Sequence, residues 1–182
     1  PPGWTARTIT TSADAAESVY AIDIDNDNDI DALSASPFDD KIAWYENNGS
    51  SPPGWTARTI TTSADAARSV FAIDVDTDGD NDVLSASSND NKIAWYENNG
   101  NSPPSWIARI ISISASSAYS VYAIDVDNEG DIDVLSVAND KIFWYESNLS
   151  SDVNVISVIP IQVVENVDLV KNKKTLVRSI IN

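Results

Sequence analysis

The sequence repeats itself every 51 residues, and this period restricts the chain to architectures built from similar units. Trp4, Trp55 and Trp106 lie in PPGWTARTITTSADAA, in an identical copy of it, and in the related PPSWIARIISISASSA. KIAWYENN occurs twice at the same spacing, and its third copy, KIFWYESN, comes two residues early because the loop before it is shorter. Such periods are typical of solenoids, propellers and arrays. The sequence therefore predicts three repeats and a different final segment: 1–51, 52–102, 103–148 and 149–182.

Each repeat has the pattern of four short strands. In the second repeat, SVFAIDV is apolar on both faces, as in an inner strand that is covered on both sides. DVLSAS is small and β-prone, and KIAWYE alternates Ile93 and Trp95 against Ala94 and Tyr96. WIARIIS gives a fourth strand. No segment shows a helical period, so we expect an all-β chain.

Four antiparallel strands at this period predict the blades of a propeller rather than a sandwich. The strand that follows each PPGW motif precedes an inner strand, so we expect it to form the outer edge of the preceding blade. Residues 4–10 are then an outer strand without a blade, and the last blade, residues 119–146, lacks its outer strand.

A propeller has about four to eight blades, and this chain encodes three at most. Its two ends are complementary, and head-to-tail surfaces produce closed rings or open filaments. The sequence thus predicts a partial β-propeller completed by self-association, with two copies and six blades as the simplest closure. The alternative is that the chain is a piece of a larger propeller.

The acidic residues are concentrated in three loops. AIDIDNDNDIDALSAS, AIDVDTDGDNDVLSAS and AIDVDNEGDIDVLSVA hold fifteen of the 28 acidic residues, five in each. Counting the first aspartate of each as position 1, acids occupy positions 1, 3, 5, 7 and 9. Carboxylates at this spacing repel one another in a tight turn unless a cation gathers them. A single acidic loop is often only a solvated turn, but three in register favour a metal.

Calcium suits these loops because it takes six to eight oxygen ligands in a flexible geometry, whereas magnesium demands a near-octahedral one. Gly79, at position 6 of the second loop, permits a sharp turn. The loops are not EF-hands. An EF-hand has a bidentate Glu at position 12 between helices, whereas Ser34, Ser85 and Ser136 occupy that position here, between predicted strands.

The pattern Asp-x-Asp-x-Asp-Gly-x-x-Asp between two strands, repeated at blade spacing, resembles the FG-GAP or VCBS calcium-binding repeat. This repeat occurs in the propellers of integrin alpha subunits and of secreted microbial proteins. The resemblance covers roughly residues 1–148 and implies a β-propeller with Ca²⁺ in the loop between the first and second strands of each blade. It further implies ligands from the side chains at positions 1, 3, 5 and 9 and from the backbone carbonyl at position 7.

The resemblance thus implies up to three Ca²⁺ ions, one in each repeat. In the first two repeats the implied ligands are Asp23, Asp25, Asp27, Asp29 (backbone) and Asp31, and Asp74, Asp76, Asp78, Asp80 (backbone) and Asp82. In the third they are Asp125, Asp127, Glu129, Asp131 (backbone) and Asp133. The second loop matches best. Asn28 replaces the glycine in the first, and Glu129 is one methylene longer than the aspartate of the family pattern.

Composition excludes several classes of function. A net charge of −17 argues against nucleic acid and anionic membranes as partners. The chain has no cysteine and no histidine, which removes disulfides, thiolate metal sites and the commonest general base. No apolar run approaches the roughly 20 residues of a membrane-spanning helix, so no membrane insertion is expected.

We expect a non-enzymatic module for adhesion or protein interaction, located outside the cell or on its surface, where calcium is millimolar. A second hypothesis is a carbohydrate-binding propeller, or an accessory domain of a secreted polysaccharide-degrading enzyme, with Trp4, Trp55 and Trp106 as stacking platforms. Catalysis by paired carboxylates, as in glycosidases, is a third. Trp44, Trp95 and Trp144, on alternating strands, are expected to pack between blades.

Residues 149–182 differ from the repeats. Their DLVKNKKTLVR motif resembles the start of a CARDB or Ig-like adhesion module. About thirty residues cannot build a sandwich of roughly 100. We therefore expect either a truncated module or strands that pair with the propeller or with another chain.

Overall fold

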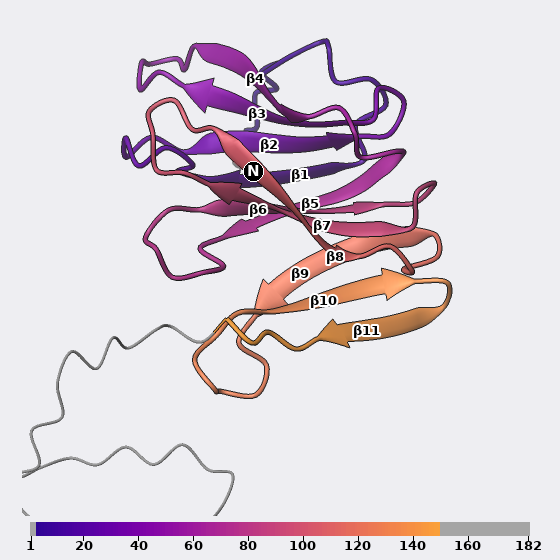
Figure 1. The fold of residues 1–182 in the computed structure, drawn as a ribbon. Helices are drawn as coiled ribbons and strands as arrows, with labels where there is room; N and C mark the ends of the chain where they lie inside the picture. Colours follow the sequence, from indigo (N-terminus) through magenta and orange to yellow (C-terminus); the bar gives the residue numbers. More distant parts are fainter. Residues whose placement is uncertain (1–2, 150–182) are drawn as a thin grey trace, which may run out of the picture. The chain divides into compact units, whose positions relative to one another are not determined.

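The structure is a computed structural model that describes residues 3–149. These residues form eleven β-strands in three antiparallel sheets and no helix, which confirms the all-β prediction (Figure 1). Within them, no helix is long and apolar enough to cross a membrane. The predicted tail lies, beyond Leu149, outside the described residues.

The three sheets follow one another along the chain, each a meander of neighbouring strands. The first contains β1 (Ser18–Ile22), β2 (Asp31–Ser36), β3 (Lys41–Asn47) and β4 (Trp55–Thr61). The second contains β5 (Ala67–Ile73), β6 (Asp82–Ser87), β7 (Lys92–Asn98) and β8 (Trp106–Ser112). The third contains β9 (Ala118–Ile124), β10 (Asp133–Ala138) and β11 (Lys141–Tyr145). The sheets are open, as expected of propeller blades in a partial ring.

The pairing register repeats from sheet to sheet. Leu33 lies opposite Trp44, and Leu84 lies opposite Trp95 in the second sheet. Trp44 in turn lies opposite Arg58 of β4. Because β4 and β8 come from the start of the following sequence repeat, each sheet is offset from the repeat, as predicted. The third sheet has three strands within the described residues, where the missing fourth strand agrees with the prediction.

Each sheet has two apolar faces. We call one the Trp face, after the tryptophan on the third strand, and the other the Val face, after the valine on the first strand. The Trp faces consist of Tyr20, Leu33, Ile42 and Trp44 in the first sheet, Phe71, Leu84, Ile93 and Trp95 in the second, and Tyr122, Leu135, Ile142 and Trp144 in the third. The Val faces consist of Val19, Ala21, Ala32 and Tyr45, then Val70, Ala72, Val83 and Tyr96, then Val121, Ala123, Val134 and Tyr145. Side chains alternate between the two faces because a strand has a period of two.

The core consists of Trp faces packed on Val faces. One cluster joins Leu33, Ile42 and Trp44 to the Val face of the second sheet. The next cluster joins the Trp face of the second sheet to Val121, Ala123 and Val134 of the third. The middle sheet is therefore covered on both sides, which accounts for its apolar sequence on both faces.

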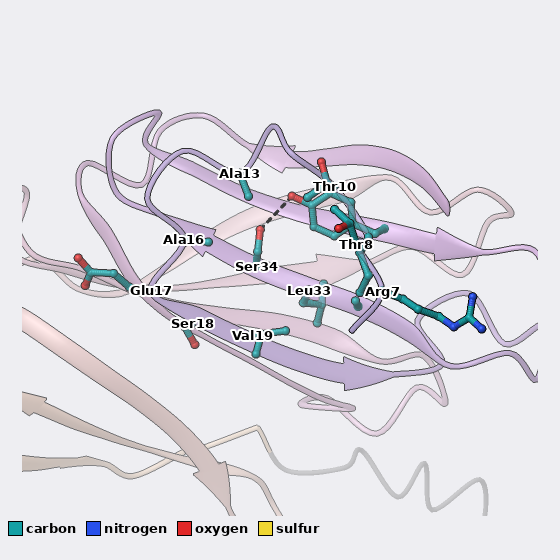
Figure 2. Close-up of a pocket in the computed structure, with 13 residues that line it drawn as sticks. Arg7, Thr8, Thr10, Ala13, Ala16, Glu17, Ser18, Val19, Leu33 and Ser34 are labelled. Carbon is teal, nitrogen blue, oxygen red and sulfur yellow. Dashed lines mark hydrogen bonds between the residues drawn. The ribbon is translucent and has the colours of Figure 1, made fainter. Parts of the chain in front are cut away.

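Residues 4–10 do not form the predicted outer strand. In the two complete sheets the outer strand pairs with the third strand of the preceding blade, and no such strand precedes residues 4–10 among the described residues. Instead, Arg7, Ile9 and their neighbours lie over the first sheet, where they line a cavity of about 510 Å³ together with Val19 and Tyr45 (Figure 2).

Candidate metal centre

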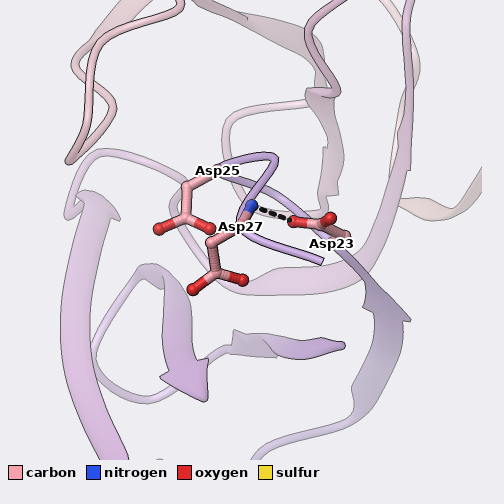
Figure 3. Close-up of side chains that lie close together, drawn as sticks. All are labelled: Asp23, Asp25 and Asp27. Carbon is pink, nitrogen blue, oxygen red and sulfur yellow. Dashed lines mark hydrogen bonds between the residues drawn. The ribbon is translucent and has the colours of Figure 1, made fainter. Parts of the chain in front are cut away.

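The three acidic loops connect the first and second strands of the three sheets, and each brings carboxylates together. In every loop, one oxygen from each of three residues lies within 4.8 Å of the other two. The first group is drawn in Figure 3. The groups are Asp23, Asp25 and Asp27; Asp74, Asp76 and Asp78; and Asp125, Asp127 and Asp133.

This spacing suits a calcium ion. Two oxygens that each bind Ca²⁺ at about 2.3–2.6 Å can be no more than about 5 Å apart. An independent sign is that Oδ1 of Asp25, at position 3 of the first loop, and Oδ1 of Asp125, at position 1 of the third, are buried and have no hydrogen-bond partner. A buried carboxylate oxygen without a donor is costly, and a bound cation would remove that cost.

The aspartate at position 1 turns each loop by accepting backbone hydrogen bonds. Asp74 accepts from the N–H groups of Asp78, at 3.1 Å, and of Gly79, at 3.0 Å. Asp23 accepts from Asp27 in the same way (Figure 3). The loop is therefore wrapped around the carboxylate at position 1, and this brings the carboxylate at position 5 back beside it.

Two positions in each loop have a left-handed backbone. At position 6, Gly79 has a φ of +99° and Asn28 a φ of +74°. At position 4, Asn26 has a φ of +60° and Thr77 a φ of +63°. The sequence pointed to position 6 through its glycines, but we did not predict position 4. Asn at positions 26 and 128 was the available signal, since Asn tolerates this conformation better than most residues.

The aspartate at position 9 ties the loop to the sheet. Asp82 is buried, and it accepts from Val75 N–H through Oδ2, at 3.0 Å, and from Asn98 N–H through Oδ1, at 2.8 Å. Asp31 makes the equivalent pair of bonds in the first sheet. Each oxygen retains a second lone pair, so both roles, metal ligand and backbone anchor, are open to this residue.

Electrostatics in the loops disfavours the metal-free carboxylates. Burial and then Asp27 raise the pKa of Asp25 to about 6, and burial and then Asp78 raise the pKa of Asp76. Burial likewise raises the pKa of Asp82 to about 7, against the backbone hydrogen bonds that lower it. These shifts mean that the folded chain concentrates negative charge where little water solvates it.

The third loop differs from the other two. Glu129 is not part of its close group, and the buried Asp133 takes the third place. Burial acts to raise the pKa of Asp133, but hydrogen bonds from Ser147 and Val126 outweigh it, so the pKa is lowered. Within the described residues the third sheet is packed on one side only, so fewer atoms surround Asp133 than surround Asp82, although both side chains are excluded from solvent.

The position 7 residues are placed beside neighbouring segments. The carboxylates of Asp29 and Asp80 lie close to Gly49 and Gly100, where a side chain would collide with them. Asp80 also accepts a hydrogen bond from Asn26 Nδ2 at 2.8 Å. Asp131, the third residue at this position, is half-buried.

A pair of asparagines contributes to the loops without having been predicted. Asn98 donates its backbone N–H to Asp82, and its Nδ2 donates to the carbonyls of Asn81 and Ile24. Asn47 anchors the first loop in the same way through its N–H. The repeated Asn at the end of YEN was the signal for this role. Asn81 Nδ2 donates in turn to the carbonyl of Asp23, at 2.8 Å.

The tryptophans separate into two groups. Trp44 and Trp95 are buried between sheets, as expected. The same prediction is wrong for Trp144, which is 48% exposed because no described residues cover its face of the third sheet. Of the three suggested sugar platforms, Trp55 and Trp106 are half-buried and pack against apolar clusters. Trp4 alone of these three is almost fully exposed.

A family model described as an FG-GAP-like repeat matches residues 23–85 and 74–136, together more than half of the chain. The chain belongs to the FG-GAP-like repeat family. Each match begins at position 1 of an acidic loop and runs to the strand after the next loop, so it spans the spacing between two candidate metal sites. A comparison with curated proteins found no match.

Proposed function

We propose that this FG-GAP-like chain is a calcium-stabilised interaction module that acts outside the cell or on its surface. The metal is structural and the module is not an enzyme. Adhesion to another protein is the role that we infer for it. Extracellular calcium modules bind at roughly 10⁻⁴–10⁻³ M, which fits the millimolar calcium of that environment.

The observation that carries the proposal is the group of carboxylate oxygens in each loop, which lie within 4.8 Å of one another. In the first and third loops, Asp25 and Asp125 also have a buried oxygen without a donor. Asp74, Asp76 and Asp78 would hold one ion, and the equivalent residues the other two. A bound ion supplies positive charge between carboxylates that otherwise repel. Three Ca²⁺ ions would offset six of the seventeen net negative charges.

The same arrangement argues for a structural role. The loop is fixed to the sheet through Asp82, whose oxygens accept from Val75 and Asn98 on two different segments. An ion held by the loop would therefore stabilise the connection between the first strand, the second strand and the end of the third. The acids of the loops are used as ligands and anchors, so catalysis is not needed to explain them.

The test is a calcium titration monitored by thermal unfolding, with EDTA as the metal-free reference. A ligand that binds only the folded state raises Tm with its concentration. We expect Asp76→Asn to lose about a third of the rise in Tm, because it disables one of three sites.

The matched control is Asp14→Asn, which makes the same change of charge at an exposed position outside the loops. It should keep the full response to calcium. A Tm that does not move with calcium would refute the proposal.

A further inference from the structure

The two interfaces between sheets inside the chain are built alike, and within residues 3–149 one half of the same interface is left uncovered on the first sheet and the other half on the third. Trp44 and Trp95 are 0% and 7% exposed beneath the next sheet, whereas Trp144 is 48% exposed. On the opposite faces, Val70 and Val121 are 4% and 5% exposed, whereas Val19 is 73% exposed. The uncovered Trp face of the third sheet and the uncovered part of the Val face of the first are thus complementary in kind.

Specific contacts repeat across the two interfaces inside the chain. Val70 N–H donates to Ser18 Oγ, and Val121 N–H donates to Ser69 Oγ, both at 3.2 Å. The next members of this series are Ser120 on β9 and the exposed Val19 on β1. Ser120 also lines a depression of about 240 Å³ on the Trp face of the third sheet.

An aromatic column crosses the same interfaces. The ring of Phe71 lies between Tyr20, at a centroid distance of 4.7 Å, and Tyr122, at 4.6 Å. Tyr122 ends the column on the uncovered Trp face, and Tyr20 begins it in the first sheet. Stacking a second copy in the same manner would continue the column from Tyr122 to Tyr20.

Among the described strands, the edge strand β11 has no partner like those of β3 and β7. Arg58 of β4 lies over the ring of Trp44, at 5.3 Å, and pairs with Glu46 at 2.6 Å. Arg109 of β8 repeats both contacts with Trp95 and Glu97. On β11 and just after it, Trp144 and Glu146 are exposed at the sheet edge.

Residues 4–10, WTARTIT, match the strand that is missing beside β11, because they are identical in sequence to β4. Its arginine, Arg7, is exposed. The connector after it is already held as in the next repeat: Lys41 Nζ donates to Ser12 O, as Lys92 Nζ donates to Ser63 O. The cavity beneath the segment lies against Val19 and Tyr45, on the face that another sheet would cover (Figure 2).

We propose that a second copy of this chain docks end to end on the first. Its residues 4–10 add to β11 as the missing fourth strand, and the Val face of its first sheet covers the Trp face of the third. In the register of β3 and β4, Arg7 lies opposite Trp144 and beside Glu146.

A second copy is the occupant because the chain carries both halves of one interface in matching register. The apolar faces supply burial, and the Arg7–Glu146 pair supplies opposite charges at the rim. Each docking leaves the same two halves free at the ends of the pair, so repetition yields either a closed ring or a filament. Calcium does not form part of the docking contact, so both tests are carried out at a constant calcium concentration.

The first test is a disulfide cross-link in the full chain. Thr56 lies opposite Glu46 in β4 and β3, so the docking places Thr5 of one copy opposite Glu146 of the other. Opposed residues of antiparallel strands lie about 4.5–5.5 Å apart, within reach of a disulfide. The chain has no native cysteine to compete. The double variant Thr5→Cys, Glu146→Cys should form covalent dimers and larger species on oxidation.

The control is Thr10→Cys, Glu146→Cys, which is out of register and should cross-link at least tenfold less. Equal cross-linking of both variants would overturn the proposed register. A disulfide within one chain, shown by an unchanged mass, would overturn docking between copies.

The second test is molar mass by sedimentation as a function of concentration. Ile142→Asp changes the uncovered Trp face at a position that is 80% exposed, and should return the protein to the 19.7 kDa monomer. Ile110→Asp, in the middle sheet and 65% exposed, should not. A discrete oligomer and a growing filament both support docking. A monomer at all concentrations, or equal effects of the two variants, would overturn it.

Discussion

The second and third sheets carry nearly the same residues in different surroundings. Phe71, Leu84 and Trp95 of the second sheet are covered by the third, whereas Tyr122, Leu135 and Trp144 face outward. The strands form in both sheets, so the local pattern is sufficient for the sheet. The comparison shows that burial in this fold comes from the next repeat along the chain, as in other arrays in which each unit contacts only its neighbours.

The difference in packing between the second and third sheets also affects their acidic loops. Asp82 and Asp133 occupy equivalent positions and accept equivalent backbone bonds, yet the pKa of Asp82 is raised and that of Asp133 lowered. The middle loop lies in a sheet that is packed on both sides. A neighbouring sheet therefore changes the pKa values in a candidate metal site, in addition to the packing of the core.

The largest expected effect in this comparison is on packing. Trp95→Ala should lower the free energy of unfolding by about 3–5 kcal/mol, because it leaves a cavity between two sheets. Trp144→Ala should cost the isolated chain only about 1 kcal/mol, since half of that side chain is exposed. Chemical denaturation at low protein concentration measures both. Equal losses would mean that the third sheet is covered in the isolated chain.

A second effect concerns pH in the absence of metal. The folded-state pKa of Asp82, about 7, lies above its ordinary value of 3.8, so the folded protein binds the proton more tightly than the unfolded chain does. Stability from this group is then fully present below pH 4 and is lost as pH rises to 7, by on the order of 4 kcal/mol. Thermal unfolding in EDTA between pH 5 and 8 should show this loss.

Two variants assign this pH dependence. Asp82→Asn should reduce the slope of the profile, because it removes one titrating group, and Asp25, whose pKa is raised to about 6, should account for part of the slope that remains. Asp133→Asn should not flatten it, because the pKa of Asp133 is lowered rather than raised. The interpretation fails if the two variants alter the pH profile equally.

The smallest effect is on loop backbone strain. Thr77 has a φ of +63° at position 4 of the second loop, where the third loop has Asn128. A β-branched residue is disfavoured in this conformation. Thr77→Asn should therefore stabilise the protein by about 1 kcal/mol, and Asn128→Thr should destabilise it by a similar amount. Reversible thermal unfolding of both variants gives the two values, and the expectation is wrong if the signs do not differ.

Much of the fold was accessible from sequence because the repeat appears three times. The alternation of Ile93 and Trp95 against Ala94 and Tyr96 fixed the two faces of β7, and the period fixed the order of the strands. Residues 4–10 were assigned a strand that they do not form, because a strand needs a partner and sequence pattern does not say whether one is present.

The candidate site was predictable to the same extent. The repeated spacing of the acids indicated that each loop gathers carboxylates, and the family pattern singled out Glu129, which is one methylene longer than the aspartate it replaces. It did not reveal that Asp82 is anchored to Asn98, because that contact joins segments whose approach depends on strand pairing. The strained backbone at Thr77 was also hidden, since Thr has no preference for it.

The hydrogen bonds between the first two loops have a consequence for metal uptake. Asn26 donates a hydrogen bond to Asp80, and Asn81 donates one to the carbonyl of Asp23. Ordering one loop therefore helps to order the other. If the proposed ions bind, an ion that fixes one loop would reduce the entropy that the other must lose, and the two binding events would be cooperative. A calcium isotherm of this chain should thus be steeper than that of three independent sites.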